Sequence, residues 1–347
     1  MDTSVTPNPL QPGDRVAILS PSLGLPEILP LPFDLGLQRL REDFDLEPVE
    51  YPTTRAMGSS PQARSHDIHA AFADPSIKGI ISSIGGDDQI TVLPHLDAEL
   101  IAANPKPFFG FSDCVNFLAY LNRLGIVGYH GGTVMTALGR PGAMHPVTEA
   151  CLRAALFTRG EFMLPEAKDF TDRASDWEDP ATFEEEPATV PSDGWRWHNF
   201  DRVVEGRTWG GNLEILSWLA MANQQMPAPE ELAGQVLFLE TSEELPDHNV
   251  VYRILRNFGE RGFLRQCAAL LWGRPKAWNF DKPLTVQESN EFAENQLASV
   301  EKAMQQYAPD TPIVFDVDFG HTDPQVVIPY GGPIQVDGIN KTISVIY

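Results

Sequence analysis

The first part of the chain alternates between short apolar runs and segments with apolar positions at helical spacing. Residues 15–20 follow a Pro-Gly turn and read as a buried strand, and Phe33, Leu37 and Leu40 then recur at helical spacing. The pattern repeats, which predicts strands at residues 15–20, 77–84, 108–111 and 126–129. Helices are predicted between them, around residues 33–40, 61–73 and 115–124. Alternation of this kind with short connections indicates a parallel sheet covered by helices.

The last part of the chain has the same alternation and ends in turns. Strands are predicted at residues 236–240, 268–273 and 313–316. Helices are predicted from the Gly210-Gly211 turn to about residue 222, at 249–259 and at 285–307, the last opened by a Thr285-to-Glu288 capping box. Residues 328–347 are expected to form short antiparallel strands around two Gly-containing turns. A smaller α/β domain with a β-rich end is therefore predicted.

The two parts are separated by a segment of different character. Residues 166–186 are strongly acidic, contain prolines and show no periodicity, and Trp195 and Trp197 follow them. Such a segment is typical of a linker or a long surface loop. We therefore expect an N-terminal domain at 1–160, an acidic linker at 161–206 and a C-terminal domain at 207–347.

Composition and charge exclude some classes of binding partner. Apolar residues make up 42% of the chain and charged residues 21%, as in globular proteins generally. The 48 acidic and 25 basic side chains give a formal charge of −23. A surface this negative repels phosphate backbones and anionic lipid, so nucleic-acid and membrane partners are not expected.

Cysteine and histidine spacing offers no metal or disulfide framework. Cys114, Cys151 and Cys267 are scattered without a CxxC pair, and no HExxH motif or clustered ligand spacing is present. No cofactor is expected. The N-terminus lacks a signal-peptide pattern and no long apolar stretch occurs, so we expect a cytoplasmic protein.

Three motifs fall at predicted strand carboxyl ends, where α/β sheets bind ligands. They are the Gly85-to-Asp88 turn, Ser112 and His130-Gly131-Gly132. Ser112 stands between a strand and a helix, where a nucleophile's hydroxyl is exposed beside backbone N–H groups. Only the first glycine of the usual GxSxG elbow is present, however, and taken alone the segment favours a helix N-cap.

A nucleophilic serine needs a base and a group that orients the base. His321 lies between Gly320 and Thr322 on a loop just past a predicted strand, and His130 is its rival. Glu240 ends the apolar run at 236–239, so its carboxylate emerges at a strand terminus. An exposed loop histidine and a solvated strand-end acid are the ordinary alternatives.

Together these segments resemble the serine LD-carboxypeptidase family, and within it the branch of microcin C immunity-type peptidases. The resemblance runs nearly end to end through short motifs in a fixed order. They are residues 12–17, 84–88, 93–97, 110–113, 210–213, 237–240 and 320–321. It implies a Rossmann-like N-terminal domain joined to the smaller α/β domain, with the site between them, and a homodimer.

The resemblance also implies a serine peptidase site. The expected triad is Ser112, Glu240 and His321, with an oxyanion hole from the backbone amides of the Gly85-Gly86 turn and of Asp113. The implied substrate is a small-molecule peptidyl or aminoacyl nucleotide, cleaved at an amide bond. The residues expected to contact it are Gly85, Asp88, Asn212, Trp195 and Trp197.

Two alternatives stay open at this stage. An LD-carboxypeptidase that releases D-Ala from a murein tetrapeptide would use the same triad. A non-catalytic peptide- or nucleotide-binding protein on the same scaffold would not need it. Locally, Asn212 could cap the helix that follows instead of touching substrate, and Trp195 and Trp197 could pack on the surface.

Overall fold

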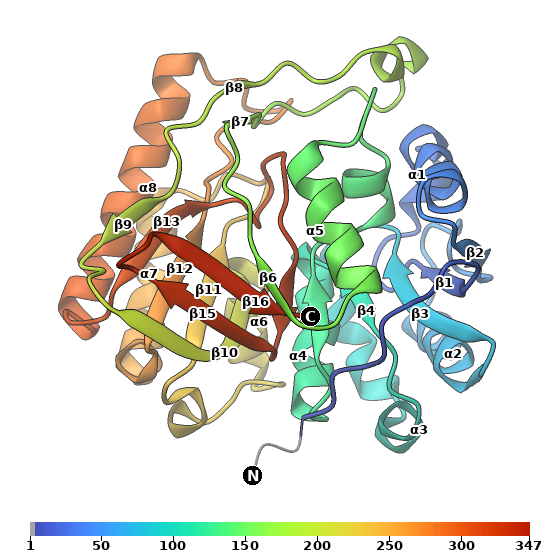
Figure 1. The fold of residues 1–347 in the computed structure, drawn as a ribbon, viewed down its shortest axis with the longest axis horizontal. Helices are drawn as coiled ribbons and strands as arrows, with labels where there is room; N and C mark the ends of the chain where they lie inside the picture. The colour runs from blue at the N-terminus through green and yellow to red at the C-terminus, as the bar shows by residue number, and fades with distance from the viewer. Residues whose placement is uncertain (1–3) are drawn as a thin grey trace.

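The computed structural model describes residues 4–347 and places them in two α/β domains (Figure 1). Within these residues the first sheet has six strands in the order β14-β5-β4-β3-β1-β2. Their bounds are β1 Arg15–Leu19, β2 Glu47–Glu50, β3 Ile77–Ser82, β4 Phe108–Gly110, β5 Gly128–His130 and β14 Ile328–Tyr330. All neighbours pair in parallel except β14, which runs antiparallel to β5. The predicted parallel sheet is confirmed.

Helices surround this sheet, some at the predicted places and others, at 98–103 and 146–157, where none was predicted. Their bounds are α1 Pro30–Glu42, α2 Pro61–Ala73, α3 Ala98–Ala103, α4 Val115–Arg123 and α5 Pro146–Phe157. The inner face of α4 is apolar because Phe117, Leu118 and Leu121 recur at helical spacing and are buried against the sheet. This packing fixes the N-terminus of α4 at the carboxyl end of β4.

The second domain is built on an eight-stranded mixed sheet, counted over the described residues, in the order β6-β16-β15-β10-β11-β12-β13-β9. The strand bounds are β6 Glu161–Met163, β9 Arg196–His198, β10 Val203–Asn212, β11 Val236–Glu240, β12 Ala269–Gly273, β13 Ile313–Val317, β15 Pro333–Asp337 and β16 Thr342–Ile346. Strands β10 to β13 are parallel and the outer ones antiparallel. The helices are α6 Leu213–Ala222, α7 His248–Glu260 and α8 Val286–Tyr307, the last with the predicted Thr285 capping box.

The structure differs from the predicted elements in the acidic segment and in the tail. Strands β6 and β9 lie within residues 161–206 and join the second sheet, and β10 already begins at Val203. The rest of that segment passes across the top of both domains in Figure 1, where β7 Asp169–Phe170 pairs with β8 Val190–Pro191. In the tail, β14 crosses to the edge of the first sheet instead of staying with β15 and β16.

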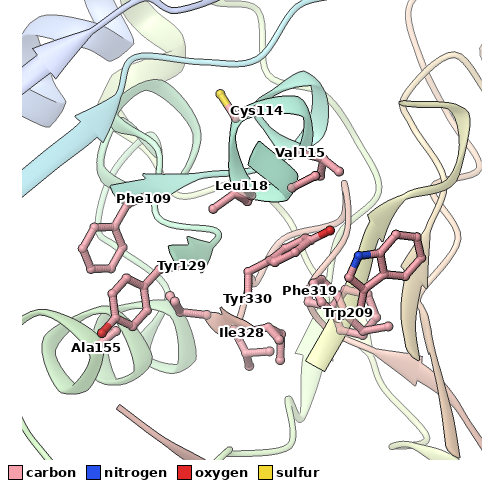
Figure 2. Packing of buried hydrophobic residues seen from close by; sticks show 14 of the residues in the cluster. Phe109, Cys114, Val115, Leu118, Tyr129, Ala155, Trp209, Phe319, Ile328 and Tyr330 are labelled. Atoms are coloured by element: carbon pink, nitrogen blue, oxygen red, sulfur yellow. The ribbon is translucent and has the colours of Figure 1, made fainter. Parts of the chain in front are cut away.

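This crossing of β14 joins the two domains through apolar side chains. Figure 2 shows Tyr330 of β14 between Leu118 on the first domain and Trp209 with Phe319 on the second. All four side chains are buried. The domains therefore share a continuous core, which fixes one set of strand ends against the other. No helix within residues 4–347 is long and apolar enough to cross a membrane.

Candidate active site

Ser112 stands on a strained turn between β4 and α4. Its φ angle is +58°, a left-handed conformation that is uncommon for residues other than glycine and typical of functional sites. A short 3-10 turn, Ser112–Cys114, then leads into α4. Gly110 permits this turn, because a Cβ atom there would lie 2.8 Å from Cys114 Cβ. The chain thus makes a sharp serine elbow without the second glycine of the usual motif.

The Asp113 side chain anchors that elbow from behind. Its buried carboxylate accepts hydrogen bonds from Ser22 Oγ at 2.5 Å, Gln89 N at 2.9 Å and Asn116 Nδ2 at 2.7 Å. Burial raises the pKa of Asp113 to about 6, against the opposing effect of the Ser22 and Gln89 hydrogen bonds. The carboxylate is therefore structural, and the role expected of Asp113 in an oxyanion hole rests on its backbone amide, although the residue is fully buried and does not line the cavity described below.

The Gly85-Gly86 turn lies directly against the elbow. A Cβ atom on Gly85 would lie 3.2 Å from Ser112 Oγ and 3.3 Å from the Asp113 amide nitrogen. Gly86 has a φ of +155°, and a Cβ atom there would lie 2.1 Å from Ser22 Oγ. Only glycine fits both positions without displacing the neighbours. The turn thus brings backbone close to the serine, as an oxyanion hole requires.

Glu240 and His321 meet where β11 ends and the loop after β13 begins. His321 Nδ1 lies 2.6 Å from Glu240 Oε2, and the Glu240 side chain is fully buried. Asn212 Nδ2 donates to the other carboxylate oxygen, Oε1, at 3.0 Å, while Asn212 Oδ1 caps α6 by accepting from Ile215 N. Asn212 therefore holds Glu240 and caps its helix at once, and both its polar atoms face protein groups.

The second ring nitrogen of His321 has an unexpected partner. Nε2 lies 3.0 Å from Glu243 Oε2, so the imidazole stands between two carboxylates. Burial alone would lower the pKa of His321, but Glu240 and Glu243 outweigh it and raise the pKa to about 10. His321 is therefore charged at neutral pH in this arrangement. Sequence reasoning missed Glu243 because it is one of several acids after β11.

The rival histidine, His130, does not face the cavity. Its ring is fully buried among Phe111, Phe238 and Phe319. Burial lowers its pKa to about 4, so it is neutral, and neither ring nitrogen has a hydrogen-bond partner among the described residues. His130 is a core side chain, and His321 is the histidine that a ligand reaches.

One cavity of about 420 Å³ lies between the domains and collects these groups. Gly85, Gly86, Ser112, Glu243 and His321 all line it. Aromatic and charged side chains also line it, from the acidic segment and from loops at the carboxyl ends of the strands. They include Trp177, Phe280, Arg140, Arg173, Lys276 and Asp323.

Besides Asn212, which does not line the cavity, three residues expected to contact substrate lie elsewhere. Trp195 is buried and its indole Nε1 donates to Asp318 at 3.0 Å, while Trp197 packs on Phe200. Asp88 forms an ion pair with Arg64 at 2.7 Å. None of the three lines the cavity.

The tryptophan that does line the cavity is Trp177, inside the acidic segment. Its position in a non-periodic stretch gave no signal of direction, so the sequence could not distinguish it from the tryptophans that follow. The same cavity residues offer no metal site: within residues 4–347, no group of His, Cys, Asp and Glu side chains is arranged to hold a metal ion.

Comparison with known proteins identifies the class. Residues 16–131 match the LD-carboxypeptidase N-terminal domain and residues 205–336 match the LD-carboxypeptidase C-terminal domain. The chain therefore belongs to the LD-carboxypeptidase family and is a hydrolase of the serine peptidase type, as predicted.

Individual relatives include members from two functional groups. The chain is 25% identical to the microcin C7 self-immunity protein MccF of Escherichia coli over 81% of this chain and 77% of that protein. It is also 25% identical to a probable murein peptide carboxypeptidase of Bacillus subtilis, over 97% of this chain and 92% of that protein. The predicted resemblance to microcin immunity-type peptidases is confirmed.

Solved structures share the fold. MccF in complex with aspartyl sulfamoyl adenosine superposes with a TM-score of 0.84 at 21% identity, covering 99% of this chain and 98% of that one. An MccF-like protein from Streptococcus pneumoniae in complex with AMP gives a TM-score of 0.84 at 24% identity, covering 96% and 99%. The predicted two-domain α/β fold is confirmed.

Proposed function

We propose that the chain hydrolyses an amide bond by acyl transfer through Ser112, His321 and Glu240. The observation that carries the proposal is the 2.6 Å contact of His321 Nδ1 with buried Glu240, in a cavity that Ser112 also lines. This arrangement leaves Nε2 as the only ring nitrogen that could take the serine proton. The contact supports the catalytic proposal over a non-catalytic binding role, which needs no such pair.

The proposed reaction has two halves. Ser112 Oγ attacks the carbonyl carbon while His321 Nε2 takes its proton, and the amides of Gly86 and Asp113 stabilise the oxyanion. The C–N bond then breaks, and His321 returns the proton to the leaving nitrogen. Water, activated by the same histidine, attacks the acyl-serine ester and releases the acid. Each oxyanion donor is worth about 3–4 kcal/mol in enzymes where it has been removed.

For the substrate we propose an aminoacyl or peptidyl nucleotide. The cavity offers Trp177 and Phe280, flat apolar surfaces on which a purine base could stack. The fold is shared with proteins in complex with aspartyl sulfamoyl adenosine and with AMP. The second candidate is a murein tetrapeptide ending in D-Ala, which is supported by the relatives named for murein peptides.

The two candidate substrates are separated by one comparison. The purified protein is given an aminoacyl sulfamoyl adenosine and a murein tetrapeptide under identical conditions, and product release is followed by chromatography. We expect cleavage of the nucleotide at a higher kcat/KM. Preference for the tetrapeptide would make the chain an LD-carboxypeptidase, and cleavage of neither, together with no fluorophosphonate labelling of Ser112, would favour the binding role.

Trp177 provides a test of the base-binding surface. Trp177→Ala should raise KM for an aminoacyl sulfamoyl adenosine about 5- to 150-fold, because base–aromatic stacking is worth about 1–3 kcal/mol. Trp177→Phe should restore most of the affinity. Trp197→Phe, which changes a tryptophan outside the cavity, is the control and should leave KM unchanged. An unchanged KM in Trp177→Ala would place the nucleotide elsewhere.

The homodimer and the cytoplasmic location implied by the resemblance remain predictions. Light scattering on the purified protein over a range of concentrations tests the first, because it measures the molar mass of the particle and a stable homodimer should show twice the mass of the chain. Fractionation of the producing cell tests the second.

A further inference from the structure

The contact between Glu243 and His321 conflicts with the proposed reaction as it stands. His321 Nε2 must accept the proton of Ser112, yet it lies 3.0 Å from the Glu243 carboxylate. An imidazole held by carboxylates at both nitrogens keeps both its protons and cannot act as a base. Glu243 therefore has to leave Nε2 before Ser112 can be activated.

The two carboxylates around His321 differ in how firmly they are held. The Glu240 side chain is 0% exposed and also accepts from Asn212, so it is fixed. The Glu243 side chain is 58% exposed and lines the cavity. Glu240 is thus a permanent partner of His321, whereas the Glu243 carboxylate can leave His321 and bind a different cation.

The backbone around Glu243 is pinned while its carboxylate is not. The Glu243 carbonyl oxygen accepts from Asn279 Nδ2 at 2.8 Å, and the preceding Ser242 donates through N and Oγ to buried Glu214, at 3.0 Å and 2.6 Å. Release of His321 therefore requires only rotation of the Glu243 side chain, without movement of the loop.

Charges around the pair indicate what would draw Glu243 away. Besides Glu240 and Glu243, the titratable group that interacts electrostatically with His321 is the buried, neutral His130. The lysine that interacts electrostatically with Glu243 is Lys276. The Lys276 ammonium donates to the Asp172 carbonyl at 2.7 Å. No arginine or lysine within residues 4–347 forms an ion pair with Glu243, so its direct ionic partner is His321.

The other acid of the cavity is already neutralised. Asp323 lies 2.7 Å from Arg140, whose guanidinium is buried. Glu243 is consequently the carboxylate of this cavity that an incoming cation can take over. Because it touches the nitrogen that serves Ser112, such a cation would sit next to the scissile carbonyl, where the α-ammonium of an aminoacyl group lies.

We propose that Glu243 selects substrates with a free ammonium group on the acyl residue, by exchanging His321 for that ammonium when the substrate binds. This proposal rests on the proposed acyl-transfer reaction and deepens it. Binding of the cation transfers Glu243 from Nε2 to the substrate, and the freed imidazolium loses its Nε2 proton to solvent. The neutral ring then accepts the Ser112 proton.

The test compares alanyl and propionyl sulfamoyl adenosine, which differ by the ammonium alone. We expect Glu243→Gln to lower the ratio of kcat/KM values, alanyl over propionyl, about tenfold, because the ammonium then meets a neutral amide oxygen in place of a carboxylate. Glu244→Gln, an exposed neighbour that does not line the cavity, should leave the ratio unchanged. The two analogues differ in intrinsic reactivity, but this difference is the same for every variant and cancels when the ratios are compared. An unchanged ratio in Glu243→Gln overturns the selection.

The effect of Glu243 on the pKa of His321 can be measured without substrate turnover. NMR titration of the unliganded protein should show the pKa of His321 lower by about 1–3 units in Glu243→Gln than in the wild type and in Glu244→Gln, since one neighbouring charge is removed. The acidic limb of kcat/KM should move to lower pH in the same variant. An unchanged titration of His321 overturns the exchange.

Binding to an inactive protein separates failure of this proposal from failure of the proposed substrate. In a Ser112→Ala background, calorimetry measures the affinity for both analogues with and without Glu243→Gln. If neither analogue binds, the nucleotide substrate is wrong and the selection proposed here falls with it. If both bind and their affinity ratio does not respond to Glu243→Gln, only the role of Glu243 is wrong.

Discussion

Replacement of Ser112 by alanine is expected to lower kcat for amide hydrolysis by about 10⁴-fold or more, as removal of a serine nucleophile does in other triad enzymes. The reason is geometric: Ser112 is the hydroxyl held at the strained turn beside the Gly85 backbone. Single-turnover hydrolysis of the preferred substrate measures the effect. Substrate affinity should change far less than kcat, because the hydroxyl acts chiefly in the transition state.

The control for Ser112→Ala is Ser59→Ala, which removes a hydroxyl that donates a hydrogen bond to the Ala56 carbonyl, away from the cavity. It should retain the wild-type kcat. Circular dichroism and Tm of both variants establish that they are folded. Hydrolysis by folded Ser112→Ala at the wild-type rate would contradict the assignment of the nucleophile, whatever the substrate.

Much of the fold follows from local patterns along the chain. The buried strand β11 is an apolar run up to its last residue, Glu240, and α8 begins at a capping box that is recognisable in the sequence. The pairing of β14 with the first sheet could not be predicted, because the sequence of Ile328–Tyr330 resembles that of the neighbouring strands. Packing between the domains decides that β14 pairs with β5. Strands β6 and β9 are short edge strands, and their neighbours in the sheet stabilise them more than their own sequence does.

The candidate site likewise contains residues that the sequence indicated and residues that only the structure places there. The order of short motifs pointed to Ser112, Glu240 and His321, and the structure brings Glu240 and His321 into contact, with Ser112 lining the same cavity. Their catalytic roles remain predictions. No pattern distinguishes Glu243 from exposed Glu244, since only the course of the loop directs one carboxylate at the histidine. Long-range packing likewise decides that Trp177 and not Trp195 lines the cavity.

Replacement of Glu240 by glutamine is expected to lower kcat by about 10³–10⁴-fold, as loss of the orienting carboxylate does elsewhere. The glutamine amide has one oxygen and one nitrogen for two partners, Asn212 Nδ2 and His321 Nδ1, and both of these partners are donors when His321 is ready to act. One mismatch is unavoidable. If the new NH₂ group faces Nδ1, the ring carries its proton on Nε2 and cannot accept one from Ser112.

The control for Glu240→Gln is Glu205→Gln, which makes the same chemical change at an exposed strand residue and should keep full activity. Tm measurements exclude unfolding, which is a concern because Glu240 is fully buried. A Glu240→Gln variant that is folded and within tenfold of the wild-type kcat would contradict the triad.

The double variant Ser112→Ala/Glu240→Gln tests whether the two residues act through the same histidine. If they do, the losses do not add: without the serine there is no proton for His321 to take, so its orientation no longer matters to the rate. The double variant should then be about as slow as Ser112→Ala alone. Additive losses would mean that Glu240 contributes by another route, such as holding Asn212 and the start of α6, because that contribution would persist without the nucleophile.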